Sequence, residues 1–191
     1  MPQPEDAPLR SDARRNRDRI LEVALIELTR AADVPLSAIA KKAGVGQGTF
    51  YRNFPNREAL VLEVYRHEVQ QVCDAAAHLL AVHPPDRALR GWMDRLARYA
   101  MTKAGLAAAL CKATTGGTLV GVARAPLTAA VTLLLTANVE AGTIRPDVCA
   151  EDFLLAIAGL WQLDPHADGP ARAGRLLDLV MDGLRAGATR R

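Results

Sequence analysis

The sequence predicts an all-helical protein. Apolar residues recur every three or four positions along most of its 191 residues, and no segment shows the two-residue alternation of a strand. Glycine and proline separate the periodic segments. Half of the residues are hydrophobic and 24% are charged, which is typical of a folded globular protein. We therefore expect a small N-terminal helical unit followed by a larger helical domain.

Four helices are expected in the N-terminal part of the chain. Their expected bounds are residues 11–30, 36–43, 47–53 and 57–82. Ser11 or Asp12 is expected to cap the first helix. Pro35 begins the second, where its missing N–H costs little, and Gly44 ends it. Asn56 is a good N-cap for the fourth.

Five more helices are expected in the remainder. Pro84–Pro85 ends the fourth helix, and Asp86 is expected to cap the fifth, whose apolar face carries Trp92 and Tyr99. Glycine- and proline-containing breaks separate the others. Their expected bounds are residues 103–115, 125–141, 149–163 and 171–186.

The distribution of charge matters more than the net charge of +3. No acid lies between Val34 and Arg57, and the segment before it is rich in arginine. The cationic residues of these two regions are Arg10, Arg14, Arg15, Arg17, Arg19, Lys41, Lys42, Arg52 and Arg57. Two short helices joined by a tight turn and surrounded by such charge predict a helix-turn-helix whose second helix enters a DNA major groove.

Aromatic residues of the third expected helix give it an inner and an outer side. Phe50 and Phe54 are four residues apart and are expected to close a small core against Ile39 and Ile20. Tyr51 then points away from that core, and its hydroxyl can reach a phosphate.

The run IAKKAGVGQGTFYRNFPNREAL at residues 39–60, preceded by RILEVAL, resembles the tetracycline-repressor-type (TetR) family of bacterial transcriptional regulators. The similarity covers roughly residues 14–65, and its pattern AGVxxGTFYxxFxxxxxL is highly specific. The chain departs from the family at residues 31–35, where a usual glycine and a usual Ser/Thr cap are replaced. The resemblance implies a dimeric repressor whose hold on DNA is loosened by a small molecule bound in the C-terminal domain.

The resemblance places base-reading and backbone-contacting roles in the turn and the third helix. Together with two cations assigned from charge, Lys42 and Arg52, the expected DNA-binding residues are Ser37, Lys42, Gly46, Gln47, Gly48, Thr49, Tyr51, Arg52, Asn53 and Arg57. Since Gly46 and Gly48 carry no side chains, they would let the backbone approach the duplex. Taken singly, the lysines are equally well explained as a solvated helix face, but the ordered pattern favours DNA binding.

A stretch without acids, residues 105–139, predicts either ordinary core packing or the wall of a ligand cavity. The candidate wall residues of such a cavity are Trp92, Tyr99, Met101, Leu110, Cys111, Thr114 and Trp161. Because few charges are available there, the cavity would prefer a largely apolar or aromatic ligand.

Two apolar stripes in the last expected helices predict a dimerisation bundle of four helices, two from each protomer. The candidate interface residues are Phe153, Ile157, Leu160, Leu176, Leu177, Val180 and Leu184. Packing within one chain is the alternative. The stretches HEVQQ, AGTIRPD and LLDLVMDGLRAGA further resemble the SbtR-like subgroup of the family.

Several classes of function are not indicated by the sequence. It shows no catalytic motif, no metal-ligand spacing of its four histidines and no cofactor fingerprint, so we expect neither an enzyme nor a metalloprotein. Three widely spaced cysteines, no membrane span and no signal peptide predict a cytoplasmic protein.

The expected organisation is a flexible tail (residues 1–10), a DNA-binding domain (11–56) and an effector-binding and dimerisation domain (57–191). The expected partners are double-stranded DNA, a second copy of the chain and a small-molecule effector. Three alternatives stay open: an activator or effector-free DNA-binding protein, a small helical enzyme or binding module, and an adaptor with an exposed apolar patch.

Overall fold

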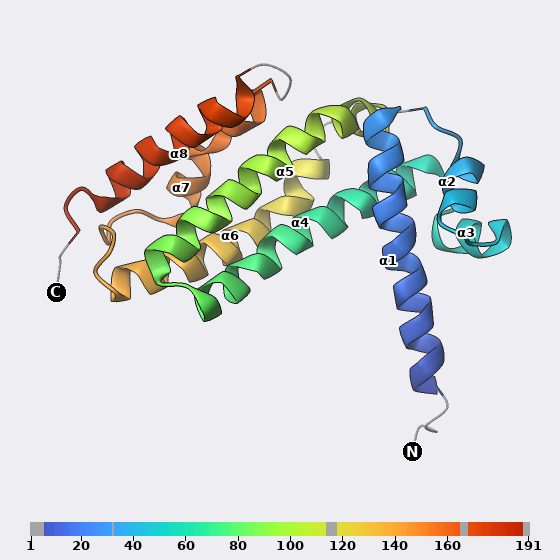
Figure 1. The fold of residues 1–191 in the computed structure, drawn as a ribbon, viewed down its shortest axis with the longest axis horizontal. Helices are drawn as coiled ribbons and strands as arrows, with labels where there is room; N and C mark the ends of the chain where they lie inside the picture. The colour runs from blue at the N-terminus through green and yellow to red at the C-terminus, as the bar shows by residue number, and fades with distance from the viewer. Residues whose placement is uncertain (1–5, 32, 114–117, 165–167, 189–191) are drawn as a thin grey trace. The chain divides into compact units, whose positions relative to one another are not determined.

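The computed structural model describes residues 6–31, 33–113, 118–164 and 168–188. Throughout these residues all regular secondary structure is helical, which confirms the all-α prediction (Figure 1). In chain order the elements are α1 (Asp6–Arg30), α2 (Leu36–Lys42), α3 (Gln47–Asn53), α4 (Arg57–Val82), α5 (Pro85–Ala113), α6 (Thr118–Glu140), α7 (Ala150–Ala156), the 3₁₀ helix η1 (Ala158–Gln162) and α8 (Gly169–Arg185).

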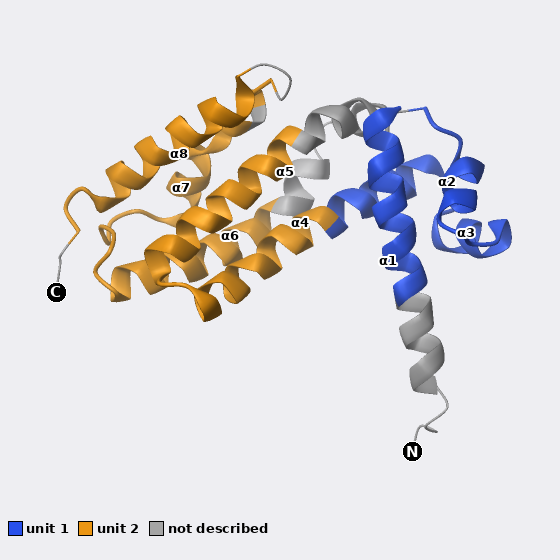
Figure 2. Ribbon diagram, in the orientation of Figure 1, with its two compact units in different colours: residues 1–67, 105–117 blue, residues 68–104, 118–191 orange. Residues whose placement is uncertain are grey.

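The chain forms two compact units, which are coloured separately in Figure 2. Unit 1 comprises residues 1–67 and 105–117, and unit 2 comprises residues 68–104 and 118–191. Helix α4 contributes to both, since His67 is the last of its residues in unit 1. These units are defined by packing, and the functional boundary expected after residue 56 stays a prediction.

The core of unit 1 joins α1, α2 and α3 with the start of α4. Helix α1 packs against α2, and α2 against α3. Phe50, Phe54, Ile39, Ile20 and Leu60 are all 0% exposed, and the rings of the two phenylalanines lie 5.7 Å apart between centroids. The expected inner side of α3 is therefore confirmed. Each buried aromatic side chain contributes roughly 1.5–3 kcal/mol to the free energy of unfolding.

Unit 2 has a core of its own. Its buried apolar residues include Leu89, Trp92, Met93, Leu96, Val131, Leu134, Phe153, Ile157, Leu160, Leu177, Met181 and Leu184. The Trp92 indole donates a 2.8 Å hydrogen bond to the carbonyl of Val72. The buried Asn138 amide donates to the carbonyl of Pro85 at 2.9 Å and accepts from the Thr143 hydroxyl at 2.7 Å. Both polar groups are thus paired within the core, as burial requires.

Helix α1 begins earlier than expected. The sequence predicts residues 1–10 as a tail and Ser11 or Asp12 as N-cap, but the helix starts at Asp6 and contains both. Pro8 does not prevent this start, because it lies in the first turn, where the backbone N–H groups have no helical partner.

The helix expected to follow Pro84–Pro85 and the one expected at residues 103–115 are a single helix, α5. No glycine or proline lies directly before the expected start at residue 103, and Gly105, two positions after it, costs only about 1 kcal/mol within a helix. At its other end, the amide of Ala88 donates to the carbonyl of Pro84 at 2.9 Å. Pro84 therefore precedes the helix as its cap, and Asp86 lies in the first turn.

The bounds of the later helices also differ from expectation. Helix α6 starts at Thr118, before the expected Ala125, and keeps Pro126 in its interior at the loss of one backbone donor. The helix expected at residues 149–163 is divided into α7 and η1. Gly159 lies just after this division, where its low helix propensity favours the change to 3₁₀ geometry.

Candidate nucleic-acid interface

The turn between α2 and α3 depends on Gly44. Its φ of +66° is in the left-handed region, which glycine adopts without strain, so Gly44 ends α2 as expected. Its amide donates to the carbonyl of Lys41 at 3.1 Å, and the amide of Val45 donates to that of Ala40 at 3.1 Å. Gly46 then takes an extended conformation as the N-cap of α3. The resulting helix-turn-helix leaves the start of α3 exposed.

The outer side of α3 and the adjoining end of α2 carry exposed polar side chains. Ser37, Lys41, Gln47 and Arg52 are exposed, and Thr49 is half-buried. Tyr51 is 41% exposed, and its ring is packed edge-on against Phe50, with 5.6 Å between centroids. This support holds the phenol side chain while its outer part remains accessible, as a phosphate-binding hydroxyl requires.

Gly46 and Gly48 face open space. A Cβ atom built on either residue meets no heavy atom within 4 Å, and neither backbone has a positive φ. Neither packing nor backbone conformation within the chain therefore requires glycine here. Glycine is an accepted N-cap at Gly46, whereas Gly48 lies inside α3 and lowers the stability of the helix. The open space beside both residues leaves room for another molecule to approach the backbone closely.

Three of the expected DNA-contacting side chains are also bound within unit 1. The Lys42 ammonium lies 2.5 Å from a carboxylate oxygen of Glu27, which is 8% exposed. The Arg57 guanidinium donates to the carbonyl of Val34 at 2.5 Å. The Asn53 amide donates to the carbonyl of Thr49 at 2.8 Å. Lys42 therefore ties α2 to α1, and Arg57 ties α4 to the segment before α2.

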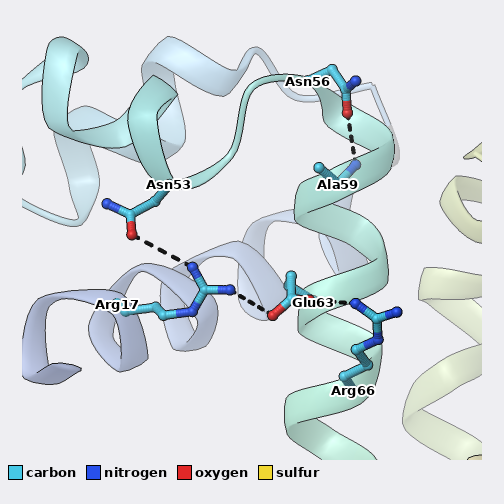
Figure 3. Close-up of polar contacts among 6 residues, drawn as sticks. All are labelled: Arg17, Asn53, Asn56, Ala59, Glu63 and Arg66. Carbon is cyan, nitrogen blue, oxygen red and sulfur yellow. Dashed lines mark hydrogen bonds and ion pairs between the residues drawn. The ribbon is translucent and has the colours of Figure 1, made fainter. Parts of the chain in front are cut away.

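An ionic network connects α1, α3 and α4 (Figure 3). Arg17 on α1 donates to the Glu63 carboxylate at 2.6 Å and to the Asn53 side-chain oxygen at 3.5 Å. Arg66 donates to the other carboxylate oxygen of Glu63 at 2.6 Å. Partial burial alone raises the pKa of Glu63, but the hydrogen bonds and charges of Arg66 and Arg17 outweigh it and hold that pKa below its usual value.

Sequence reasoning did not identify Glu27 and Glu63 as parts of this unit. The signal for Glu27 is its place among the apolar residues Ala24 and Leu28 of α1, where an unpaired carboxylate would be costly. For Glu63 the sequence shows only the neighbouring Arg66, three positions later on the same helix, and gives no signal for Arg17, which lies 46 positions away in the chain.

The lowered pKa of Glu63 predicts a pH dependence of stability. A carboxylate with a folded-state pKa below its unfolded value stabilises above the unfolded pKa, and this stability is lost as pH falls through the folded pKa. We expect Glu63→Gln to unfold more easily than the wild type at pH 7, by up to about 1 kcal/mol for a partly exposed pair. The difference should shrink as pH falls below the ordinary glutamate pKa and vanish at a pH below the lowered pKa of Glu63. Urea unfolding at neutral and acidic pH measures it, and a constant difference would contradict the assignment.

The candidate effector-wall residues are only partly described. Trp92 and Tyr99 are buried core residues, and Met101 is half-buried. Thr114 and the side chains of Leu110, Cys111 and Trp161 lie outside the described part of the structure. A depression of about 530 Å³ is present elsewhere in unit 2, beside α6 and the start of α7. Its lining residues are Thr132, Leu135, Thr136, Val139, Glu140, Pro146, Val148, Cys149, Ala150 and Glu151.

Most of the candidate dimer residues lie inside unit 2. Those that are buried within the single chain are Phe153, Ile157, Leu160, Leu177 and Leu184. Val180 is half-buried, and Leu176 is 37% exposed. Among the large apolar residues of α7 and α8, the most exposed are instead Leu155, at 76%, and Leu179, at 69%.

The described residues lack two features found in other classes of protein. Within this part of the chain, no helix combines the length and apolar character needed to cross a bilayer. The same residues contain no group of three His, Cys, Asp or Glu side chains placed to hold a metal ion.

Comparisons with known proteins agree with the helix-turn-helix geometry. Residues 20–64 match the family model for bacterial regulatory proteins of the tetR family. Residues 84–186 match the model described as the C-terminal domain of SbtR-like transcriptional regulators. A helix-turn-helix-type transcriptional regulator of Staphylococcus aureus is 35% identical over 63 residues, which are 32% of this chain and 34% of that protein. The chain thus matches about a third of the length of such curated relatives.

Solved structures extend the similarity over nearly the whole chain. A TetR transcriptional regulator from Streptomyces coelicolor is 45% identical, with a TM-score of 0.77, over 88% of this chain and 98% of its own. A TetR regulatory protein from Mycobacterium vanbaalenii is 37% identical, with a TM-score of 0.74, over 93% and 99%. These matches confirm the resemblance seen in the sequence. The chain belongs to the TetR family of bacterial transcriptional regulators, with an SbtR-like C-terminal domain.

Proposed function

We propose that the chain is a homodimeric repressor that binds a pseudo-palindromic DNA operator and is released from it by a small, largely apolar effector. The observation that carries the DNA-binding part is the exposed, acid-free start of α3, where Gly46 and Gly48 leave the backbone open. In this proposal residues 11–56 bind DNA, and residues 57–191 bind the effector and the second protomer. The protein would act in the cytoplasm.

The contacts with DNA follow from the geometry of α3. One α3 from each protomer would enter successive major grooves, whose centres are about 34–36 Å apart. Gln47 and Thr49 would meet base edges, since they lie beside the open backbone of Gly48. The Tyr51 hydroxyl and exposed cations such as Lys41 would bind phosphates, so the affinity should fall steeply with salt.

The test is a titration of the purified protein against labelled duplex DNA, followed by fluorescence anisotropy at two salt concentrations. The probe is the duplex recovered by selecting a random-sequence library on the wild-type protein, and the unselected library is the reference. Tighter, salt-dependent binding of the selected duplex that weakens in Tyr51→Ala would support the proposal. Equal binding of both DNAs would contradict it.

Gly48→Ala separates stability from DNA binding. Because the added methyl group faces open space and alanine favours a helix, unit 1 should become no less stable, with a gain of up to about 0.5 kcal/mol. The same methyl group would keep the backbone from the duplex, and we expect about a 10-fold loss of affinity for the selected DNA, the cost of one good contact. Urea unfolding and anisotropy measure the two effects.

Gly159→Ala is the matched control for this variant. Its methyl group also meets open space, but it lies in η1 of unit 2. We expect no change in DNA affinity. If both alanine variants bind the selected duplex as the wild type does, the close approach to α3 is refuted.

Dimerisation is supported by the leucines left exposed on α7 and α8. Leu155 and Leu179 are more than two-thirds exposed, although the neighbouring apolar residues of both helices are buried in unit 2. Singly exposed leucines are ordinary on a protein surface, but leucines left exposed on the helices that carry the two expected dimer stripes are available to a partner chain. We therefore assign the second protomer to the surface of Leu155, Leu176 and Leu179 and not to the buried residues of the same stripes.

The effector part of the proposal is supported by family membership and by the acid-free residues 105–139. Release requires that the effector bind the DNA-incompetent state more tightly, with a coupling of about 1–3 kcal/mol. A panel of apolar and aromatic compounds added to the protein–DNA complex tests it. If one compound dissociates the complex, the result supports an effector-controlled repressor. If none does, the result favours the effector-free alternative.

A further inference from the structure

Arg17 contacts three parts of unit 1 at once. Its guanidinium is 2.6 Å from the Glu63 carboxylate of α4 and 3.5 Å from the Asn53 side-chain oxygen of α3. It also lies over the ring of Phe54, directly after α3, at 4.8 Å from the ring centre. A planar guanidinium is suited to such a site, because it stacks on an aromatic ring while its edge donates several hydrogen bonds.

These contacts hold the side chain of Asn53 at the C-terminal end of α3. The amide nitrogen of Asn53 donates to the carbonyl of Thr49 at 2.8 Å, and its oxygen accepts from Arg17. An asparagine amide has one donating and one accepting side, so the 2.8 Å bond to Thr49 directs its oxygen toward Arg17, which it meets at the longer distance of 3.5 Å. Thr49, the acceptor, lies one helical turn earlier, among the residues proposed to read bases.

Glu63 in turn holds Arg17. Its side chain is 27% exposed, and its two carboxylate oxygens are each taken by an arginine, Arg17 on one and Arg66 on the other. The charge of Arg17 is therefore compensated by Glu63. This makes Arg17 a poorer ligand for phosphate. We call the bridge that Arg17 forms from α1 to Glu63 on α4 and Asn53 on α3 the Arg17 brace.

We infer that Glu63 and Arg17 are positioning residues for DNA recognition, in which an acid on α4 fixes the reading helix through an arginine on α1 and the side chain of Asn53. The inference rests on the proposed use of α3 to read DNA. It predicts a change in DNA affinity opposite to the change expected from charge alone. Removing an acid from a DNA-binding unit should tighten binding to any DNA, whereas loss of this brace should weaken binding to the cognate sequence.

The experiment compares Glu63→Gln with the full-length wild type on two DNAs, the selected duplex and the unselected library. We expect about a 10-fold weaker affinity for the selected duplex, the size of coupling common within one hydrogen-bond network. Affinity for the unselected library should stay equal or rise. Equal or tighter binding of the selected duplex by Glu63→Gln overturns the inference. If the wild type itself does not discriminate between the two DNAs, the proposed function fails instead.

Two further variants test whether Glu63 acts on DNA affinity through Arg17. Arg17→Lys keeps the charge but cannot stack and bridge as a guanidinium does, so it should lose selectivity as Glu63→Gln does. The double variant should lose no more than either single one, because both break the same brace. Additive losses would overturn the inference.

Arg66→Gln is the matched control. It removes the other ion pair of Glu63, within α4, and leaves Arg17 and Asn53 in contact. Its ratio of selected to unselected affinity should change by less than about 2-fold, as for an ordinary surface pair. A loss of selectivity equal to that of Glu63→Gln would assign the effect to the Glu63–Arg66 pair within α4 and not to Arg17, and would overturn the inference. Circular dichroism melting of each variant verifies that unit 1 is folded.

Discussion

Replacing Leu155 and Leu179 together by aspartate should convert a dimer into monomers without unfolding the chain. Both side chains are largely exposed in the single chain, at 76% and 69%, so the substitutions leave the core of unit 2 intact. In an apolar interface, four aspartates per dimer would be buried without partners, which is strongly unfavourable. Analytical ultracentrifugation measures the mass in solution, and circular dichroism verifies the fold.

DNA binding should fall with the dimer. A dimer binds its second half-site as an intramolecular step, which raises affinity by a factor of 10²–10⁴ in comparable bivalent systems, so the monomer should bind the selected duplex at least about 100-fold more weakly. Ile26→Asp, on α1, is the control for the oligomeric state, because Ile26 is also exposed, at 51%, but lies in unit 1. A Leu155/Leu179 variant that stays dimeric would place the interface elsewhere.

The sequence predicted α2, α3 and the start of α4 closely because each is bounded by residues with a definite backbone preference, whereas the start of α1 was wrong. Pro35 and Gly44 mark α2, Gly46 begins α3, and α4 starts after Asn56. In α5 and α6 the expected helix starts at residues 103 and 125 were wrong, since each helix begins earlier and keeps Gly105 or Pro126 in its interior. A single residue of low helix propensity costs a few kcal/mol at most, which tertiary packing can offset.

Periodicity alone could not separate core from interface in the last helices. Leu177 and Leu179 are two positions apart in one stripe, yet they are 1% and 69% exposed. Both satisfy the apolar pattern of α8, and only the packing of the other helices decides which is covered. Sequence patterns therefore identify a helix as apolar on one side without defining where the covered surface ends.

The sequence predicts which side chains of the candidate DNA-binding site are exposed, but not the ion pairs that connect them to other helices. The exposed, acid-free start of α3 follows from local sequence, because a short helix with Phe50 and Phe54 inside must present Gln47 and Tyr51 outside. The ion pairs of Lys42 and Arg17 depend on acids supplied by other helices. Such contacts are set by tertiary structure, and charge counted along the chain cannot reveal them.

Phe50→Ala should abolish DNA binding through unit 1 while the dimer persists through unit 2. Phe50 is fully buried between the rings of Phe54 and Tyr51, so truncation removes about 3–5 kcal/mol, a large part of the 5–15 kcal/mol that stabilises a typical domain. Unit 2 keeps its own core around Trp92 and Phe153. We expect urea unfolding to show an early transition for unit 1 and a later one for unit 2.

Phe50→Leu serves as the control, because it retains most of the buried volume and should cost only roughly 1–2 kcal/mol. That variant should still bind the selected duplex at low temperature. Loss of the dimer in Phe50→Ala, together with a single unfolding transition, would show that the two units fold as one. The leucine pair and Phe50 thus give opposite results: one variant is folded but monomeric, and the other is dimeric without a folded DNA-binding unit. These opposite results are expected only if DNA binding depends on the core of unit 1 and dimerisation on the core of unit 2.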